Sequence, residues 1–269
     1  MLMEVKNQLK VMFLSVKYNI MRQMTNKVTF VTNITFMILN NASFIIQWII
    51  FLGLKEEIGG YTLKQIMLLW GMAASTFGIS HILFYKAFEL SDLIINGKLD
   101  SFLVQPKNVF LSVITSETSI SAIGDLLYGY ICLFIYGITI KSFILFTVFS
   151  ITGAIILTAF VSIVGSLSFW IVKGDALADA FASIMLNFAT YPGTIFKTTV
   201  KIILYTLIPV GIANYMPVET IINFSFTNFI YIIVFTILIT LLAFLIFNKG
   251  LKDIHLLIWW AREFNKIKF

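Results

Sequence analysis

Two acidic residues inside apolar sequence are the first candidates for chemistry in this chain. Glu117 and Asp125 lie eight residues apart, with Ser121 between them. On an ideal helix this spacing corresponds to about 80° of rotation, so the two carboxylates would share one broad face. A charge at the bilayer centre costs roughly 2.5–3.5 kcal/mol on insertion scales, so we expect Asp125 to face protein or water. Two interpretations stay open: a substrate or proton site, or a structural contact near the cytoplasmic end of a span.

The patterns of common intramembrane enzymes are missing from the sequence. Its two histidines, His81 and His255, lie far apart, and no His-Glu-x-x-His zinc motif or Gly-x-Ser-x-Gly nucleophile motif is present. His81 is interpreted as an interhelical hydrogen-bond donor rather than a ligand. The single cysteine, Cys132, can form neither an intramolecular disulfide nor a thiolate cluster. We therefore expect no catalytic, cofactor-binding or metal site in this chain.

Composition predicts the elements that must position these residues. The chain is 59% hydrophobic and 12% charged, with a mean hydropathy of +0.95, whereas soluble domains are about 25% charged. An all-α polytopic membrane protein is expected, with residues 1–269 in a single transmembrane domain. No solvated patch interleaves aromatic and basic residues, so no nucleic-acid partner is predicted. Runs near the roughly 20 apolar residues that a span requires predict six transmembrane helices, at Phe30–Leu54, Ile66–Phe88, Ile120–Ile140, Phe143–Val172, Ala176–Tyr191 and Asn228–Phe247.

An interrupted apolar region precedes the last predicted span. Three of the four prolines, Pro192, Pro209 and Pro217, interrupt it. Irregular backbone at membrane depth persists only where protein or a watery cavity satisfies its amide groups, and interrupted apolar segments are typical of transport pathways or re-entrant elements. We interpret residues 192–222 as a re-entrant extracellular hairpin. The alternative is a pair of ordinary spans with a proline kink.

The basic residues predict the orientation of the chain. With six spans and both termini in the cytoplasm, the outer side holds five of the 19 lysines and arginines, which leaves 14 on the inner side. Positive charge favours the cytoplasmic side. This arrangement places residues 89–108 and the C-terminal tail, residues 248–269, in the cytoplasm. Trp259 and Trp260 in that tail are expected to anchor it at the membrane interface.

The N-terminal residues 1–27 predict an amphipathic helix along the inner membrane surface. Such a helix presents its lysines, Lys6, Lys10 and Lys17, to anionic lipid. Either a plain anchor or a lever that contacts a cytoplasmic subunit fits this pattern. The apolar side chains recur at spacings of three and four residues, at Leu2, Val5, Leu9, Met12, Phe13, Val16 and Ile20.

Residues 89–108 form a charged, amphipathic interruption between the second and third predicted spans. Apolar residues lie on both sides of Asn96-Gly97, which predicts two short helices separated by a glycine break. Pro106 is expected to end the second helix or to start the next. A solvated loop is the alternative.

The stretch 95–106, Ile-Asn-Gly-Lys-Leu-Asp-Ser-Phe-Leu-Val-Gln-Pro, resembles the sequence before the third span of type-2 ABC exporter permeases, in the six-span branch. The resemblance implies a cytosolic coupling helix that contacts the ATP-binding subunit. Gln105 stands where the family commonly has arginine, so docking is expected to depend more on apolar residues than on an ion pair. The implied contacts are Asn96, Gly97, Lys98, Leu99, Asp100, Phe102, Leu103, Gln105 and Pro106. The later Tyr191, Pro192, Gly193, Pro209 and Pro217 are similar to the re-entrant region of that branch.

The chain has no Gly-x-x-x-x-Gly-Lys-Ser/Thr phosphate loop. Under the resemblance, ATP and Mg²⁺ belong to a dimer of separate ATP-binding subunits, and this chain pairs with a second permease, identical or different, in a bacterial cell membrane. The expected function is export of a hydrophobic or amphipathic drug, antimicrobial peptide or lipid. Two alternatives remain: an ion-coupled secondary transporter, and a membrane immunity or assembly protein that transports nothing.

Overall fold

The computed structural model describes residues 2–171 and 174–267, with side chains described at residues 6–253 except 9, 172 and 173. The described residues are helices and connecting turns with no strand among them, which confirms the all-α prediction for this part of the chain. The α-helices are α1 Leu2–Gln23, α2 Lys27–Leu54, α3 Leu63–Phe84, α4 Leu90–Ile95, α5 Asp100–Leu103, α6 Val109–Ile114, α7 Ala122–Tyr136, α8 Ile140–Ser166, α9 Gly174–Ala189, α10 Thr198–Thr206, α11 Met216–Ile222 and α12 Phe226–Ile267. Shorter helical turns are η1 Tyr85–Ala87, η2 Leu167–Phe169, η3 Gly193–Ile195 and the π-helical turn η4 Gly211–Tyr215.

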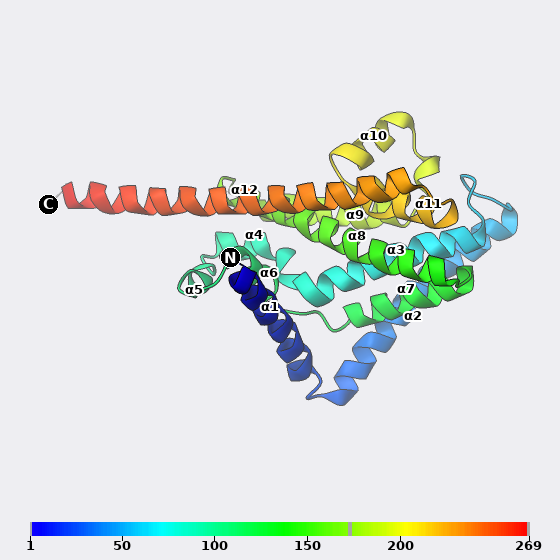
Figure 1. The fold of residues 1–269 in the computed structure, drawn as a ribbon, viewed down its shortest axis with the longest axis horizontal. Helices are drawn as coiled ribbons and strands as arrows, with labels where there is room; N and C mark the ends of the chain where they lie inside the picture. Colours follow the sequence, from blue (N-terminus) through cyan, green and yellow to red (C-terminus); the bar gives the residue numbers. More distant parts are fainter. Residues whose placement is uncertain (1, 172–173, 268–269) are drawn as a thin grey trace.

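Close backbone contact joins α3 and α7 at the centre of the bundle (Figure 1). A Cβ atom added at Gly71 would lie 2.8 Å from the carbonyl oxygen of Gly129, and one added at Gly129 would lie 2.6 Å from that of Gly71. Small residues of this kind let membrane helices approach until their backbones touch. The short helix α7 is therefore held against α3 by shape rather than by long side chains.

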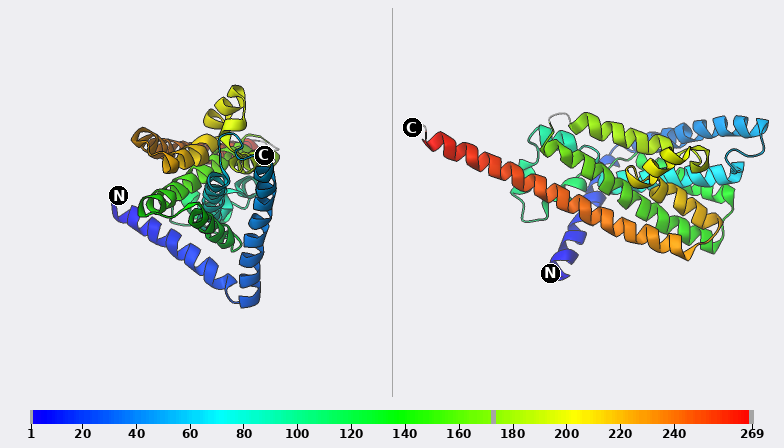
Figure 2. Two further views of the ribbon diagram at one scale, coloured as in Figure 1. Left: turned by 90° about the vertical axis from the view of Figure 1, so that its right-hand side faces the viewer. Right: turned by 90° about the horizontal axis from the view of Figure 1, so that it is seen from above.

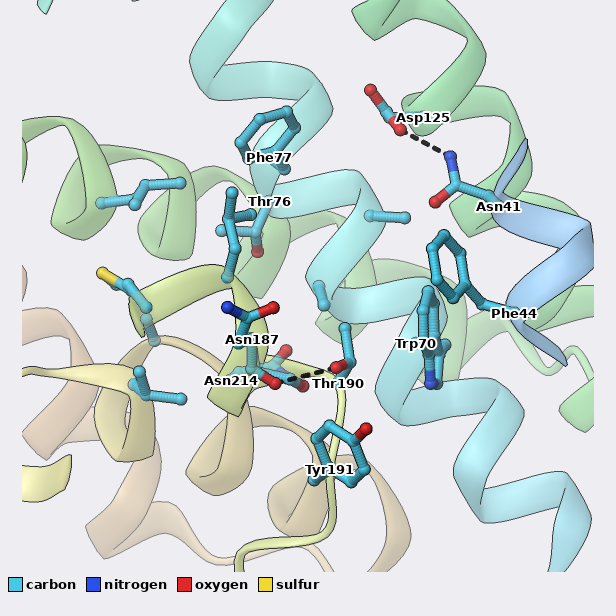
Figure 3. Close-up of a pocket in the computed structure, with 18 of the residues that line it drawn as sticks. Asn41, Phe44, Trp70, Thr76, Phe77, Asp125, Asn187, Thr190, Tyr191 and Asn214 are labelled. Atoms are coloured by element: carbon cyan, nitrogen blue, oxygen red, sulfur yellow. Dashed lines mark hydrogen bonds between the residues drawn. The ribbon is translucent and has the colours of Figure 1, made fainter. Parts of the chain in front are cut away.

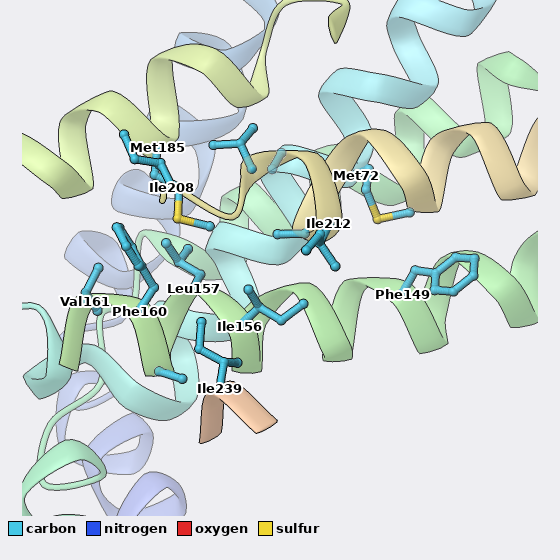
Figure 4. Packing of buried hydrophobic residues seen from close by; sticks show 14 of the residues in the cluster. Met72, Phe149, Ile156, Leu157, Phe160, Val161, Met185, Ile208, Ile212 and Ile239 are labelled. Carbon is cyan, nitrogen blue, oxygen red and sulfur yellow. The ribbon is translucent and has the colours of Figure 1, made fainter. Parts of the chain in front are cut away.

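Helix α8 forms the other half of the core. Its start is capped by Thr139, whose Oγ1 accepts a hydrogen bond of 3.1 Å from the amide of Ser142. Most of α3 and α8 is buried inside the protein. Figure 4 shows the apolar packing that α8 organises with α3, α9, η4 and α12, through Met72, Phe149, Ile156, Leu157, Phe160, Met185, Ile212 and Ile239.

Helices α2 and α12 lie on the outside of the bundle with most of their apolar surface exposed. α12 has 42 residues and is about 63 Å long at 1.5 Å per residue, roughly twice the thickness of a hydrocarbon core. It extends beyond the bundle, past α4 and α5 (Figure 1). Up to Ile267, the predicted tail at 248–269 is thus the continuation of helix α12 rather than a separate element. The side chains of Trp259 and Trp260 lie outside the described residues.

Helix α1 runs across the bundle direction rather than along it (Figure 2). A turn at Met24–Asn26 connects it to α2, and the Asn26 side chain caps α2 by accepting a 3.2 Å hydrogen bond from the amide of Thr29. The predicted N-terminal helix is therefore present and ends at Gln23. Its crossing direction matches that of a helix on a membrane surface when the bundle axis stands along the membrane normal.

Four helical stretches are long and apolar enough to cross a membrane: Lys27–Leu54, Leu63–Ile95, Ile140–Phe169 and Phe226–Asp253. A fifth is counted if the bent pair of α10 and η4–α11 crosses as one broken span. At the third and fifth predicted spans, α7 and α9 have 15 and 16 residues, about 22 and 24 Å, less than the hydrocarbon core. The described structure supports four or five spans, and six spans stay a prediction.

The region 192–222 is irregular, as its prolines predict. α9 ends before Pro192, and the chain turns through η3 into α10, which is bent by 84° from η4–α11 at a break that contains Pro209. The expectation that Pro217 also interrupts this region is wrong. Pro217 lies at the start of α11, directly after the π-helical turn η4, and the helical stretch Gly211–Ile222 continues through it. The change from π-helix to α-helix at this point accommodates the proline.

Candidate functional site

The 89–108 segment folds as two short helices around a glycine turn, which confirms the predicted break. Gly97 adopts a φ of +65°, a conformation that glycine enters without Cβ strain. Asp92 of α4 stabilises the turn, because its carboxylate accepts hydrogen bonds from Asn96 Nδ2 at 2.5 Å and from Lys98 Nζ at 3.1 Å. The turn is thus tied to the preceding helix by side chains that are themselves exposed.

Asn108 closes the segment and starts the next helix. Its side chain accepts a 3.0 Å hydrogen bond from the amide of Leu111, the capping contact that asparagine makes at helix starts. Pro106 lies outside both α5 and α6, so it ends the second piece as predicted. The segment therefore lies between two helices, with no long irregular connection at either end.

Apolar residues of the segment divide between the core and the surface. Leu99 is 5% exposed and packs in the hydrophobic core, with Phe102 half-buried against it. The prediction that Leu99 faces a partner is wrong, because its side chain attaches the segment to the bundle. Val104 is 84% exposed, and the sequence reasoning passed over it. The other predicted contacts are exposed, apart from half-buried Leu103: Asn96, Gly97, Lys98, Asp100, Gln105 and Pro106.

Lys86 joins the start of the 89–108 segment to the chain before α7. Its Nζ lies 2.5 Å from a carboxylate oxygen of Glu89 and 2.5 Å from one of Glu117. Glu117 belongs to the irregular stretch 115–121, whose Ser119 amide donates to the carbonyl oxygen of His81 at 3.0 Å. The predicted helical face shared by Glu117 and Asp125 is therefore wrong, because this backbone bonds to α3 and α7 begins only at Ala122.

A polar stripe on α1 contacts the same stretch. Ser15 Oγ, Asn19 Nδ2 and Gln23 Nε2 donate to the carbonyl oxygens of Thr115, Ser116 and Thr118, at 2.9, 2.9 and 2.8 Å. The three donors are spaced by four residues, so they lie on one face of the helix. Sequence reasoning followed the apolar residues of α1 and missed this stripe, although its spacing is visible in the sequence.

His81 is a packed residue rather than a ligand. Its ring stacks on Phe77 with 3.7 Å between centroids and lies 3.9 Å from the ring of Phe88. Nδ1 lies 3.1 Å from both Ser80 Oγ and the carbonyl oxygen of Phe77. These contacts stay within α3 and the turn that follows it, so the predicted interhelical hydrogen bond is wrong.

A partly open cavity of about 430 Å³ lies between α2 and α3 on one side and α9 and η4 on the other, with exposed wall residues such as Phe44 and Leu186 at its opening (Figure 3). Its size falls in the range of small-molecule sites. Aromatic rings form much of its wall, and Phe44 stacks on Trp70 at 5.5 Å between centroids. Polar side chains enter the wall from separate elements, among them Asn41, Thr76, Asp125, Asn187 and Asn214.

Asp125 lies at the α7 side of this cavity and is 5% exposed. Asn41 of α2 donates to its Oδ1 at 2.6 Å and, with the same amide nitrogen, to the carbonyl oxygen of Met37 at 3.1 Å. Asp125 Oδ2 is buried without a hydrogen-bond partner among the described residues. The expectation that Asp125 faces protein rather than lipid is confirmed.

Opposite Asp125, the irregular region closes the cavity. Asn214 and Tyr215 of η4 donate to the carbonyl oxygens of Ala189 and Phe188, at 2.5 Å each, and so hold the end of α9. Predicted Tyr191 lines the cavity and contacts Trp48 with 5.6 Å between ring centroids. Predicted Gly193 packs against Tyr215, since a Cβ there would lie 2.6 Å from that ring. Pro192 follows the end of α9 and Pro209 lies in the break between α10 and η4, whereas Pro217 lies within α11.

Fold and site together define a polytopic helical membrane protein with a partly open cavity, largely apolar but with several polar side chains in its wall, and a two-helix element at one end whose first helix, α4, packs in the core. The profile of the family described as ABC-2 family transporter protein matches residues 37–255, and the chain belongs to this family. The match includes the cavity, the 89–108 segment and the irregular region. No curated protein and no solved structure matches the chain.

Proposed function

We propose that this chain is the permease subunit of an ABC exporter that moves a hydrophobic or amphipathic substrate out of the cytoplasm. The 89–108 segment carries the proposal: in a chain of the ABC-2 family, a short two-helix element fixed to the core by Leu99 presents Val104 and polar side chains outward. We assign this element as the coupling segment. Hydrolysis of ATP belongs to a separate subunit, because the chain has no phosphate loop.

The proposed assembly contains two permease subunits, identical or different, and a dimer of ATP-binding subunits that hold ATP and Mg²⁺. It lies in a bacterial cell membrane with both termini of this chain in the cytoplasm, an orientation that the excess of basic residues on that side favours. Lipid covers the exposed apolar faces of α2 and α12.

Three contacts connect the coupling segment to the helices of the bundle. Leu99 packs in the core, Lys86 bridges Glu89 to Glu117 before α7, and the stretch beside Glu117 also receives the hydrogen bonds of α1. A displacement of the segment by the ATPase therefore moves α3, α7 and α1 together. Packed elements of this kind shift as rigid bodies between two states.

ATP-driven transport in membrane vesicles tests this function. Inside-out vesicles that contain the chain and its cognate ATPase are given an amphipathic fluorescent dye or a fluorescent lipid, with either ATP or an imposed ion gradient. The proposal predicts uptake with ATP and none with the gradient alone. Uptake driven by the gradient without nucleotide would identify a secondary transporter instead, and absence of transport with an intact, ATP-hydrolysing complex would contradict the exporter assignment.

A further inference from the structure

The ionisable side chains in the wall of the partly open cavity are acidic rather than basic. Asp125 is the one ionisable acidic or basic side chain in its wall apart from the phenol of Tyr191; no lysine, arginine or histidine is among the described lining residues. The rest of the polar wall is neutral amide and hydroxyl, such as Asn40, Gln47 and Thr190. An anionic ligand would meet a carboxylate here with no compensating cation, which is costly in a low-dielectric interior.

Unpartnered acceptors are fixed at two sides of the cavity. Asp125 Oδ2 and Asn214 Oδ1 are both buried without a donor among the described residues, and these side chains are 5% and 2% exposed. Their other polar atoms are committed, since Asn41 donates to Asp125 and Asn214 donates to Ala189. Buried polar atoms in native proteins are satisfied in the great majority of cases. Because both of these atoms are covered, they favour a cationic ligand through their negative potential rather than by accepting hydrogen bonds from it.

Aromatic faces complete the recognition surface. Phe44 and Trp70 stack on each other, Trp48 meets Tyr191, and Phe77 lies farther along the wall (Figure 3). Such rings attract cations through their negative faces and also bury apolar groups. The same wall therefore favours both halves of an amphipathic cation.

We propose that the cavity binds an organic monocation with an apolar, aromatic body, held by Asp125 and the ring wall, as the substrate class of this permease. The substrate role rests on the proposed exporter function. Binding itself rests on the cavity alone and needs neither ATP nor the partner subunit.

Equilibrium binding of matched ions tests the proposal. The purified chain in lipid nanodiscs is dialysed against radiolabelled tetraphenylphosphonium or against tetraphenylborate, an anion of the same shape, and binding to empty nanodiscs is subtracted. We expect saturable binding of the cation, at least about tenfold tighter than any protein-dependent binding of the anion, a difference of about 1.4 kcal/mol. Equal binding of the two ions, or no saturable cation binding, overturns the proposal without any variant.

Variants then locate the site. Asp125→Asn is expected to weaken cation binding by about tenfold or more, whereas Asp125→Glu keeps it. Asp179→Asn is the matched control, because it removes an exposed carboxylate of α9 outside the cavity wall. Unchanged binding in folded Asp125→Asn, or equal loss in Asp179→Asn, overturns the proposal. ATP-driven uptake of tetraphenylphosphonium is measured separately, so failure of the exporter function is distinguished from failure of the cation site.

Discussion

Asn41 of α2 and Asp125 of α7 are joined by a hydrogen bond of 2.6 Å, buried and 84 residues apart in sequence. The contact connects an outer helix, most of whose surface is exposed, to the short helix packed against α3. It also fixes the carboxylate at the edge of the cavity. The polar pair thus contributes both to the stability of the fold and to the proposed binding site. Unfolding and ligand-binding measurements can separate the two effects.

Breaking this pair is expected to destabilise the chain in a non-additive way. Asn41→Leu leaves the carboxylate of Asp125 buried without that donor and lowers the unfolding free energy by about 1–3 kcal/mol. The double variant with Asp125→Leu is expected to lose less than the sum of the two single changes, because neither polar group is then left unpaired. Thermal unfolding followed by tryptophan fluorescence measures all three. Asn33→Leu, an exposed position on α2, is the control, and strictly additive losses would contradict the coupling.

The contact between α3 and α7 leaves no room for a methyl group. In Gly129→Ala the new Cβ lies 1.9 Å from Ser75 Oγ and 2.6 Å from the backbone oxygen of Gly71, so the helices must separate. Overpacking predicts a loss of about 1–3 kcal/mol or more. Gly53→Ala on α2 meets nothing within 4 Å and is expected to be neutral or up to about 1 kcal/mol stabilising. Equal folded yield and melting temperature for the two variants would show that this packing is wrong.

Removal of the polar stripe should release α1 from the bundle. Alanine at Ser15, Asn19 and Gln23 together deletes three hydrogen bonds, each worth about 0.5–1.5 kcal/mol. We expect faster amide hydrogen exchange in α1 and in the stretch 115–118. A triple alanine variant at Asn7, Lys10 and Arg22, which are exposed on the same helix, should exchange as the wild type does. Unchanged exchange in the first variant would mean that these contacts do not hold α1.

Lys86→Met tests whether the ion network transmits movement. The change leaves the carboxylates of Glu89 and Glu117 without their shared cation, and because the network is partly exposed the stability loss should stay below about 1 kcal/mol. Transport per ATP hydrolysed should fall while the complex still forms. The exchanged variant, Lys86→Glu with Glu117→Lys, restores an opposite-charge pair between positions 86 and 117 and should regain transport. Wild-type transport by the Lys86→Met protein would show that the ion network does not transmit the movement of the segment.

The sequence predicts the long helices and the glycine break because each depends on local signals. α2, α3, α8 and α12 are long apolar runs, and the left-handed turn at Gly97 follows from glycine between two apolar groups. The predicted third span begins at Ile120, close to the start of α7 at Ala122. The predicted helical face of Glu117 and Asp125 fails because Glu117 bonds to Lys86 and its neighbours bond to α1 and α3 rather than within a helix. Such long-range contacts have no local pattern.

The cavity shows the same limit. Asn41, Thr76, Asp125 and Asn214 come from α2, α3, α7 and η4, and only Asp125 drew attention in the sequence because charge is rare in a span. The neutral side chains of Asn41, Thr76 and Asn214 become candidate binding groups only because the fold places them in the cavity wall. Likewise Leu99 and Val104 are both aliphatic residues of one segment, and only the fold shows that Leu99 is buried and Val104 is exposed.

Association with the ATP-binding subunit through the coupling segment is the central claim, and one pair of matched variants tests it. Val104 and Ile140 are 84% and 83% exposed, before α6 and at the start of α8 respectively. We measure the ATPase that co-purifies with a tagged chain from membranes, by its phosphate-loop peptides and its hydrolysis rate. Val104→Asp should reduce the recovered ATPase by about tenfold or more, equivalent to about 1.4 kcal/mol, while Ile140→Asp retains it. Equal recovery of an active ATPase with wild type, Val104→Asp and Ile140→Asp would contradict the account.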